Sequence, residues 1–262
     1  MIASRRRPTI VVPCYNEEHR IDESEFARAA KCGLIRLLFV DDGSSDGTSA
    51  ILSRLSELTD AIDVLTLEKN SGKGEAVRRG LLRALDDGAL SVGYYDADMA
   101  TPTDELLRLV GILNADPTLS VVLGSRIAML GTQIRRTPVR HYLGRLYASV
   151  ASFSLGTTIY DTQCGAKLFR SCPELASALA APFRSNWAFD VQLLDRLVHG
   201  YADTAGLPLE AFQEVPLRAW RDVQGSKLST LHAGKAFIDV VSLGVRRNHR
   251  RRRARALHKT PS

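Results

Sequence analysis

The feature that most constrains the fold is an alternation of short, apolar, β-rich runs with segments of helical spacing. The apolar runs cover residues 9–13, 34–42, 62–67, 90–95 and 119–125. Between them, apolar residues recur every three or four positions, as in Ile51, Leu52, Leu55 and Leu58, which is typical of a helix with one buried face. Strands that alternate with helices predict an α/β fold, with a Rossmann-like, mostly parallel sheet flanked by helices.

Polar clusters follow each of the five apolar runs. In order they read CYNEE, DDGSSD, KNSGKG, DAD and GSR. The carboxyl ends of parallel strands lie along the same edge of a sheet, and α/β proteins bind their ligands there. The sequence therefore predicts that these five clusters meet and form a single binding site.

Two aspartates one residue apart, Asp96 and Asp98, follow the run 90–95. Positions i and i+2 of an extended chain point the same way, so the two carboxylates can share one cation. Carboxylates suit Mg²⁺ or Mn²⁺, which keep some water and take further ligands from phosphates. The pattern favours an ion bound beside a diphosphate; the alternative is a pair of solvated turn acids.

Two common nucleotide-binding motifs are missing. The segment NSGKG lacks the GxxxxGK[ST] spacing of a P-loop, and the first strand does not lead into GxGxxG, which disfavours an NTPase or a dinucleotide-dependent oxidoreductase. Asp41 and Asp42 could instead accept hydrogen bonds from a base or ribose, or could serve only in a turn and helix cap. Asp46 is expected to cap the helix after this turn, and Thr101 the helix after the acid pair.

The second half of the chain is less regular. Its predicted elements are a helix over 136–156, a short strand within 161–170, a helix over 187–200, a strand over 212–220 and a helix over 228–245. The longest stretch without a charged residue, 146–160, is too short and too polar to span a bilayer. The four cysteines show no CxxC spacing, which favours reduced thiols in a cytosolic setting.

Charge is concentrated at the carboxyl end of the chain. Residues 246–262 carry eight basic residues and no acid, so residues 1–245 have a net charge of −2 although the whole chain has +6. A basic segment behind an amphipathic helix favours attachment to an anionic membrane surface. A solvated tail and nonspecific nucleic-acid binding are the alternatives, and no specific nucleic-acid partner is expected.

Eight motifs in this order resemble those of family 2 glycosyltransferases with the GT-A fold, most closely the dolichyl-phosphate β-glucosyltransferase type. They are VVPCYNEE, VDDGSSDGT, NSGKGEAV, DADMATP, GSR, DTQCGAKLF, WAFDVQLL and GSKL, and the resemblance spans roughly residues 8–240. It implies a GT-A catalytic domain at 1–227, with a nucleotide-binding half at 1–125 and an acceptor and sugar half at 126–227. Residues 228–262 would form an amphipathic helix and a polybasic tail.

The resemblance also assigns roles on the nucleotide side. Residues that match positions holding the nucleoside are Pro13, Tyr15, Glu17, Asp41 or Asp42, and Lys73. Asp96 and Asp98 match the family's DXD pair. Asp98 is then the expected direct ligand of Mg²⁺ or Mn²⁺, and Asp96 would contact the ribose or the ion.

Matches in the second half concern the acceptor and the sugar. Arg126, and Arg140 as a further candidate, match basic residues near the acceptor phosphate. The segments that line the donor sugar pocket contain Gln163, Trp187 and Asp190. Lys227 lies in the loop over the phosphates. Asp161 and Asp190 are candidate bases only if the acceptor is a hydroxyl group; otherwise they are structural loop acids. Trp187 could stack on a sugar face, but an isolated tryptophan is more often a core residue.

The implied function is an inverting, metal-dependent transfer of a hexose from a sugar nucleotide to a polyprenyl phosphate. UDP-glucose is the favoured donor, and a GDP-mannose-dependent mannosyltransferase or a transferase for glycan or protein hydroxyls is the alternative. A membrane- or nucleic-acid-binding module with an idle core is the rival from another class. The expected location is cytoplasmic, peripheral on the inner face of the plasma membrane, in cell-envelope synthesis.

Overall fold

The structure is a computed structural model that describes residues 7–135, 138–186, 188–223 and 239–240. Nine strands are defined: β1 Thr9–Cys14, β2 Arg36–Asp41, β3 Ile62–Thr66, β4 Ser91–Tyr95, β5 Val121–Ser125, β6 Gln133–Arg135, β7 Ala166–Arg170, β8 Phe212–Pro216 and β9 Ala219–Arg221. The helices are α2 Glu23–Lys31, α3 Thr48–Glu57, α4 Lys73–Asp86, α5 Thr103–Ala115, α6 Pro138–Leu155, α7 Pro173–Leu179, α8 Phe189–His199 and the short 3₁₀ turn η1 Leu209–Ala211.

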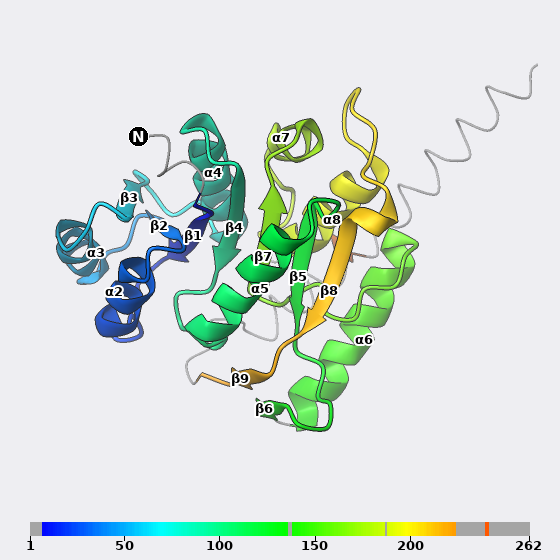
Figure 1. Cartoon of the computed structure of the whole chain (residues 1–262), viewed down its shortest axis with the longest axis horizontal. Helices are drawn as coiled ribbons and strands as arrows, with labels where there is room; N and C mark the ends of the chain where they lie inside the picture. Colours follow the sequence, from blue (N-terminus) through cyan, green and yellow to red (C-terminus); the bar gives the residue numbers. More distant parts are fainter. Residues whose placement is uncertain (1–6, 136–137, 187, 224–238, 241–262) are drawn as a thin grey trace, which may run out of the picture.

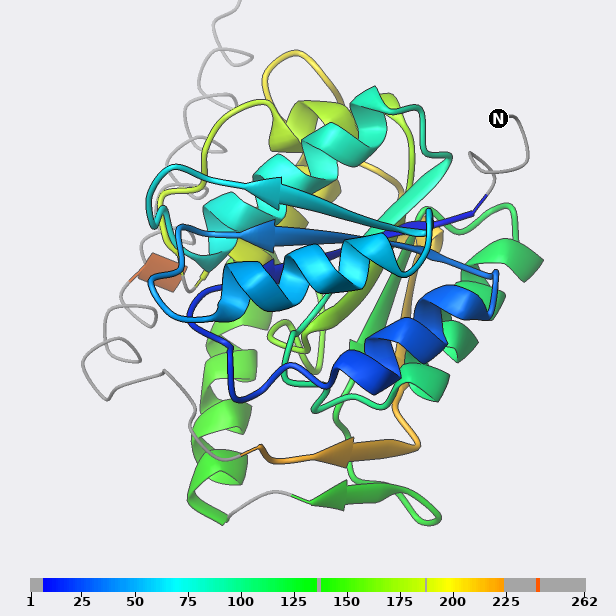
Figure 2. The ribbon, with the colours of Figure 1, turned by 90° about the vertical axis from the view of Figure 1, so that its left-hand side faces the viewer.

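Seven strands form one sheet in the order β3-β2-β1-β4-β7-β5-β8 (Figure 1). Strand β7 runs antiparallel to both of its neighbours, β4 and β5, whereas the other pairs are parallel. The predicted mostly parallel α/β sheet is therefore confirmed. Strands β6 and β9 pair with each other in a separate two-stranded ribbon, which lies beside the start of α6 in both views (Figures 1 and 2).

Helices cover both faces of the sheet and form two apolar layers. Helices α2, α3 and α5 pack on one face, around side chains such as Phe39 and Leu168. Helices α4, α6, α7 and α8 pack on the other, around Val40 and Phe169. Because the sheet is covered on both sides, its central strands β1, β4 and β5 are mostly apolar and buried, which is why they could be recognised as buried in the sequence.

Some predicted boundaries need correction. Helix α5 begins at Thr103 after Pro102, which is extended with ψ 148° and makes no side-chain cap, so the cap predicted at Thr101 is wrong. Pro102 is itself extended and occupies the cap position, so the helix starts one residue later than predicted, and the Thr101 carbonyl accepts the Tyr95 hydroxyl. The strand expected over 212–220 is two strands, β8 and β9, which belong to different sheets.

Other predicted elements fall partly or wholly outside the part of the chain that is described. Helices α6 and α8 form where the sequence places them, but the helix expected over 228–245 and the basic segment 246–262 lie outside the described residues, apart from 239–240. Among the residues that the structure describes, no helix is long and apolar enough to cross a bilayer.

Candidate active site

The acid pair lies at the carboxyl end of β4, where a tight turn points both carboxylates into the same region. The Met99 N–H donates to the Asp96 carbonyl at 3.3 Å, and Met99 has a φ of 49°. The Ala100 N–H donates to Oδ1 of Asp98 at 3.1 Å. Backbone geometry therefore fixes the orientation of the pair that the sequence singled out.

Each acid of the pair has a cationic partner. Lys73 Nζ lies 2.5 Å from Asp96 Oδ1, and an Arg20 terminal nitrogen lies 2.8 Å from Asp98 Oδ2. The Arg20 guanidinium also contacts Glu17 at 3.2 Å. Clusters after β1, β3 and β4 thus meet at one point, as the sequence predicts for the carboxyl edge of the sheet.

Arg20 is a site residue that the sequence reasoning missed. Its side chain is 20% exposed and comes from the turn after β1, just beyond the motif VVPCYNEE. The signal available was its position three residues after Glu17, but a long side chain can reach many partners, so spacing alone could not identify Asp98 as one of them.

Gly165, just before β7, makes room for Asp96. A Cβ on Gly165 would lie 1.9 Å from Asp96 Oδ2 and 2.2 Å from its Cγ, and the Gly165 carbonyl accepts the Asp96 N–H at 3.1 Å. Only glycine leaves the carboxylate where it is. The sequence reasoning quoted this glycine within DTQCGAKLF and gave it no role.

The two aspartates at the carboxyl end of β2, Asp41 and Asp42, hold neighbouring loops. The buried Asp42 carboxylate accepts the N–H groups of Ser71 and Gly72, both at 2.7 Å. Burial raises the pKa of Asp42, and these two hydrogen bonds oppose that shift. Asp41 accepts the N–H of Ser44 at 3.0 Å and the hydroxyl of Ser49. The contacts order the glycine-rich loop ahead of α4, which carries Lys73.

Two further residues assigned to the nucleoside lie at the same edge. Pro13 is in β1 beside Val40 of β2, and Tyr15 is 38% exposed just after β1. The Tyr15 ring is thus reachable by a ligand from solvent. In the sequence Tyr15 is two residues before Glu17, whose carboxylate pairs with Arg20.

Arg126 and Asp161 form a bidentate pair beyond β5. Arg126 Nε and a terminal nitrogen lie 2.6 and 2.7 Å from the two oxygens of Asp161, and the Arg126 N–H donates to the same carboxylate at 2.9 Å. The guanidinium also stacks 5.5 Å from the centre of the Trp220 ring. Burial by itself would lower the pKa of Arg126, but the Asp161 charge outweighs it and raises that pKa.

Asp190, at the start of α8, sits in a buried polar network. Its Oδ1 accepts the Tyr94 hydroxyl and lies 2.8 Å from Lys167 Nζ, while Gln163 Nε2 donates to Oδ2 at 3.4 Å. Burial raises the pKa of Asp190 and lowers that of Lys167. Lys167 is fully buried and was missed, although a lysine within the apolar strand AKLFR was a usable signal.

Three candidates named from the sequence, Arg140, Trp187 and Lys227, have side chains outside the described part of the structure. The remaining candidates gather in two groups, one around Asp96 and Asp98 and one around Asp161 and Asp190. Gln163 connects to both acids of the second group, because its N–H also donates to Asp161 at 3.2 Å.

The oxygens of the acid pair fit a hard divalent cation. Within the described residues, no group of three or more His, Cys, Asp or Glu side chains could hold a metal ion. Two carboxylates with no soft ligand suit Mg²⁺ or Mn²⁺, whose other ligands would be water and phosphate oxygens. Asp96 and Asp98 are therefore the residues that would hold such an ion.

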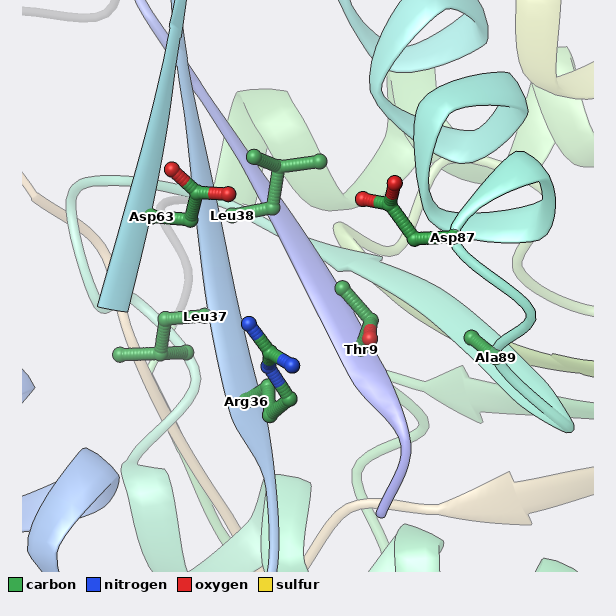
Figure 3. Close-up of a pocket in the computed structure, with 7 residues that line it drawn as sticks. All are labelled: Thr9, Arg36, Leu37, Leu38, Asp63, Asp87 and Ala89. Atoms are coloured by element: carbon green, nitrogen blue, oxygen red, sulfur yellow. The ribbon is translucent and has the colours of Figure 1, made fainter. Parts of the chain in front are cut away.

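A small hollow elsewhere on the molecule is unrelated to this site. It lies where β1 and β2 begin, at the opposite edge of the sheet, and its lining includes Thr9, Arg36, Asp63 and Asp87 (Figure 3). Its volume is about 30 Å³, which is the space of a water molecule. It is too small for a nucleotide or a sugar.

Comparisons with known proteins show which family this chain is similar to. The family model described as Glycosyl transferase family 2 matches residues 9–172. Dolichyl-phosphate beta-glucosyltransferase of Mus musculus is 32% identical over 254 residues, covering 88% of this chain and 73% of that protein. Polyprenol monophosphomannose synthase of Mycolicibacterium smegmatis is 27% identical over 243 residues, covering 92% and 88%.

Among solved structures, glucosyl-3-phosphoglycerate synthase from Mycobacterium tuberculosis, in complex with Mn²⁺, UDP-glucose and phosphoglyceric acid, has a TM-score of 0.66 to this chain. The sequence identity is 21%, and the match covers 93% of this chain and 81% of the other. At this identity the likeness concerns the fold.

Proposed function

The chain belongs to glycosyl transferase family 2 and has the GT-A fold, and from this premise we propose that it transfers a hexose from a sugar nucleotide to a polyprenyl phosphate. The observation that carries the proposal is the pair Asp96 and Asp98, set beside Lys73 and Arg20 at the carboxyl edge of the sheet. Carboxylates for an ion and cations for phosphates are what a departing nucleoside diphosphate requires.

A bound Mg²⁺ or Mn²⁺ would supply positive charge beside the leaving diphosphate. In this proposal Asp98 and Asp96 would hold the ion. Lys73, at the start of α4, would contact the leaving diphosphate. Charge develops on the leaving oxygen while the anomeric carbon becomes oxocarbenium-like. Attack by the acceptor from the opposite face inverts the configuration at that carbon.

The pairing of Asp161 supports a phosphate acceptor. Asp161 is held bidentately by Arg126, and a carboxylate bound by a guanidinium in this way is a weak proton acceptor. Burial raises the pKa of Asp190, so this acid is the one that would act as a base if the acceptor were a hydroxyl group. A phosphate oxygen is already anionic and needs no strong base, whereas a hydroxyl acceptor does. Asp161 takes Nε and one terminal nitrogen of Arg126, and in this proposal the other terminal nitrogen binds the acceptor phosphate.

Glucose from UDP-glucose is the favoured donor, because the segments from residue 161 onward resemble the glucosyltransferase type. GDP-mannose is the alternative.

In this proposal residues 1–227 form the catalytic domain, and residues 228–262 attach it peripherally to the inner face of the plasma membrane. Each basic residue near an anionic surface contributes about 1 kcal/mol, so the eight in 246–262 would suffice.

The test is transfer of radiolabel into the organic phase. The full chain is incubated with Mn²⁺, a polyprenyl phosphate in detergent and either UDP-[¹⁴C]glucose or GDP-[¹⁴C]mannose. We expect label to enter the lipid from one donor only, and to fall at least about 100-fold with EDTA or with Asp98→Asn. Asp104→Asn is the matched control, since that side chain is 81% exposed. Full transfer by Asp98→Asn in EDTA would refute the mechanism.

Two variants separate the phosphate acceptor from a hydroxyl acceptor. If either acid is a base, Asp161→Asn or Asp190→Asn should lower kcat by about 100-fold or more. For the phosphate acceptor we expect Asp161→Asn to act mainly on the acceptor KM, because it releases Arg126. Calorimetry with UDP and Mn²⁺ tests the remaining rival, a binding module, which would show no metal-linked nucleotide binding.

A further inference from the structure

The acid pair is already neutralised by side chains of the protein itself. Three carboxylates, from Glu17, Asp96 and Asp98, face two cations, Arg20 and Lys73. These five groups belong to three segments of the chain that follow β1, β3 and β4. A divalent cation that enters this cluster must therefore compete with two cations already in place.

The competition is most direct at Asp98. Its Oδ1 accepts the Ala100 N–H at 3.1 Å, and its Oδ2 contacts Arg20 at 2.8 Å. An ion that binds Oδ2 has to share that oxygen with a guanidinium or displace it. Sharing places like charges side by side, which is unfavourable in a partly buried site.

A phosphate group would relieve this conflict. The guanidinium of Arg20 is a planar donor that suits phosphate oxygens as well as carboxylates. Its side chain is 20% exposed, and its contact with Glu17 is longer, at 3.2 Å. Arg20 can therefore exchange Asp98 for an anion that arrives from solvent while it stays near Glu17.

We propose that Arg20 is a diphosphate-binding residue whose transfer from Asp98 to the nucleotide couples the binding of the divalent ion to the binding of the nucleotide. This inference rests on the proposed function, which supplies the diphosphate. When the diphosphate takes Arg20, Asp98 becomes free for the ion; when the ion takes Asp98, Arg20 becomes free for the diphosphate. Each ligand then tightens the other by the same factor.

The experiment measures Mn²⁺ affinity with and without saturating UDP, by electron paramagnetic resonance of free Mn²⁺, on the full chain. For the unaltered chain we expect UDP to tighten Mn²⁺ binding by about tenfold or more. In Arg20→Met, Mn²⁺ alone should bind more tightly than in the unaltered chain, since Asp98 has lost its competitor. The tightening by UDP should fall at least about threefold relative to the unaltered chain, and the part that remains comes from phosphate oxygens that bind the ion directly.

Two further variants sharpen the result. Arg20→Lys keeps the charge and should keep most of the coupling. Arg28→Met is the matched control, because Arg28 lies on α2, pairs with Glu25 and has no contact with Asp98; its values should equal those of the unaltered chain. Thermal unfolding of each variant checks that it is folded.

The outcomes distinguish the inference from the proposed function. If the unaltered chain binds neither UDP nor Mn²⁺, the proposed function fails, and the inference fails with it. If the unaltered chain shows the coupling and Arg20→Met shows it undiminished, only the role of Arg20 is refuted. Weaker binding of Mn²⁺ alone to Arg20→Met than to the unaltered chain would also refute the role of Arg20. Such a result would mean that Arg20 does not compete with the ion for Asp98.

Discussion

Replacement of Gly165 by alanine should remove catalysis while leaving the protein folded. The added Cβ would lie 1.9 Å from Asp96 Oδ2 and 2.2 Å from Asp96 Cγ. Contacts of a Cβ under 3.0 Å essentially do not occur, so the carboxylate has to move by about 1 Å or more. A displacement of about 1 Å in an active site can lower the rate about 100-fold, and we expect a loss of this size in kcat.

The stability change should be small, for two reasons. Gly165 has no positive φ, so alanine introduces no backbone strain there and even gains about 0.4–1 kcal/mol by restricting the unfolded chain. The contact between Lys73 and Asp96 that would be lost is about one-third exposed, and such a pair contributes only about 0–1 kcal/mol. The free energy of unfolding should therefore change by no more than about 1 kcal/mol.

The assay compares initial rates of hexose transfer with urea unfolding of the same preparations. Gly111→Ala is the matched control, because no atom lies within 4 Å of the Cβ that it adds on α5. That control should keep full activity and gain about 0.5–1 kcal/mol of stability. If Gly165→Ala keeps its rate within about threefold of the unaltered chain, the argument that this glycine positions the acid is refuted.

Three further predictions concern other parts of the molecule. Burial raises the pKa of Asp190 to about 8. Between about pH 4 and 8 the native state therefore keeps a proton that the unfolded chain has lost, so the free energy of unfolding falls as the pH rises. Urea unfolding at pH 5 and pH 8 should show this fall, and the Asp190→Asn variant should not. Asp42→Asn places an amide where two backbone N–H groups donate and should lower the free energy of unfolding by about 1–3 kcal/mol, whereas no loss would mean that this carboxylate does not hold the loop. Burial raises the pKa of the Cys164 thiol to about 11. Iodoacetamide at pH 8 should therefore modify the exposed Cys32 and reach Cys164 only in urea. Mass spectrometry of the native protein would contradict this if it found Cys164 modified first.

The sequence predicts the strands and the polar segments at the carboxyl edge of the sheet well, because these depend on local patterns. Apolar β-rich runs are buried on both faces of the sheet, and the polar clusters behind them necessarily lie at one edge. The turn at Asp96 and Asp98 follows in the same way. The family resemblance is confirmed by the match over residues 9–172.

The remaining features depend on contacts between distant parts of the chain. Nothing local in AKLFR reveals that β7 inserts antiparallel between β4 and β5, since pairing partners are chosen by the whole sheet. Arg20 and Lys167 were missed for a related reason, because a long basic side chain identifies no partner until the fold places an acid within its reach. The functional roles assigned to the site residues, those of Pro13, Tyr15 and Gln163 included, stay predictions.

The insertion of β7 has a consequence for the order in which the chain can fold. When synthesis has reached only the end of β5, the strands β3, β2, β1 and β4 can already pair with one another, but β5 has no partner. Both of its neighbours, β7 and β8, come later in the sequence. The first four strands should therefore form an early nucleus, and closure of the sheet around β7 should be the slow, nonlocal step of folding.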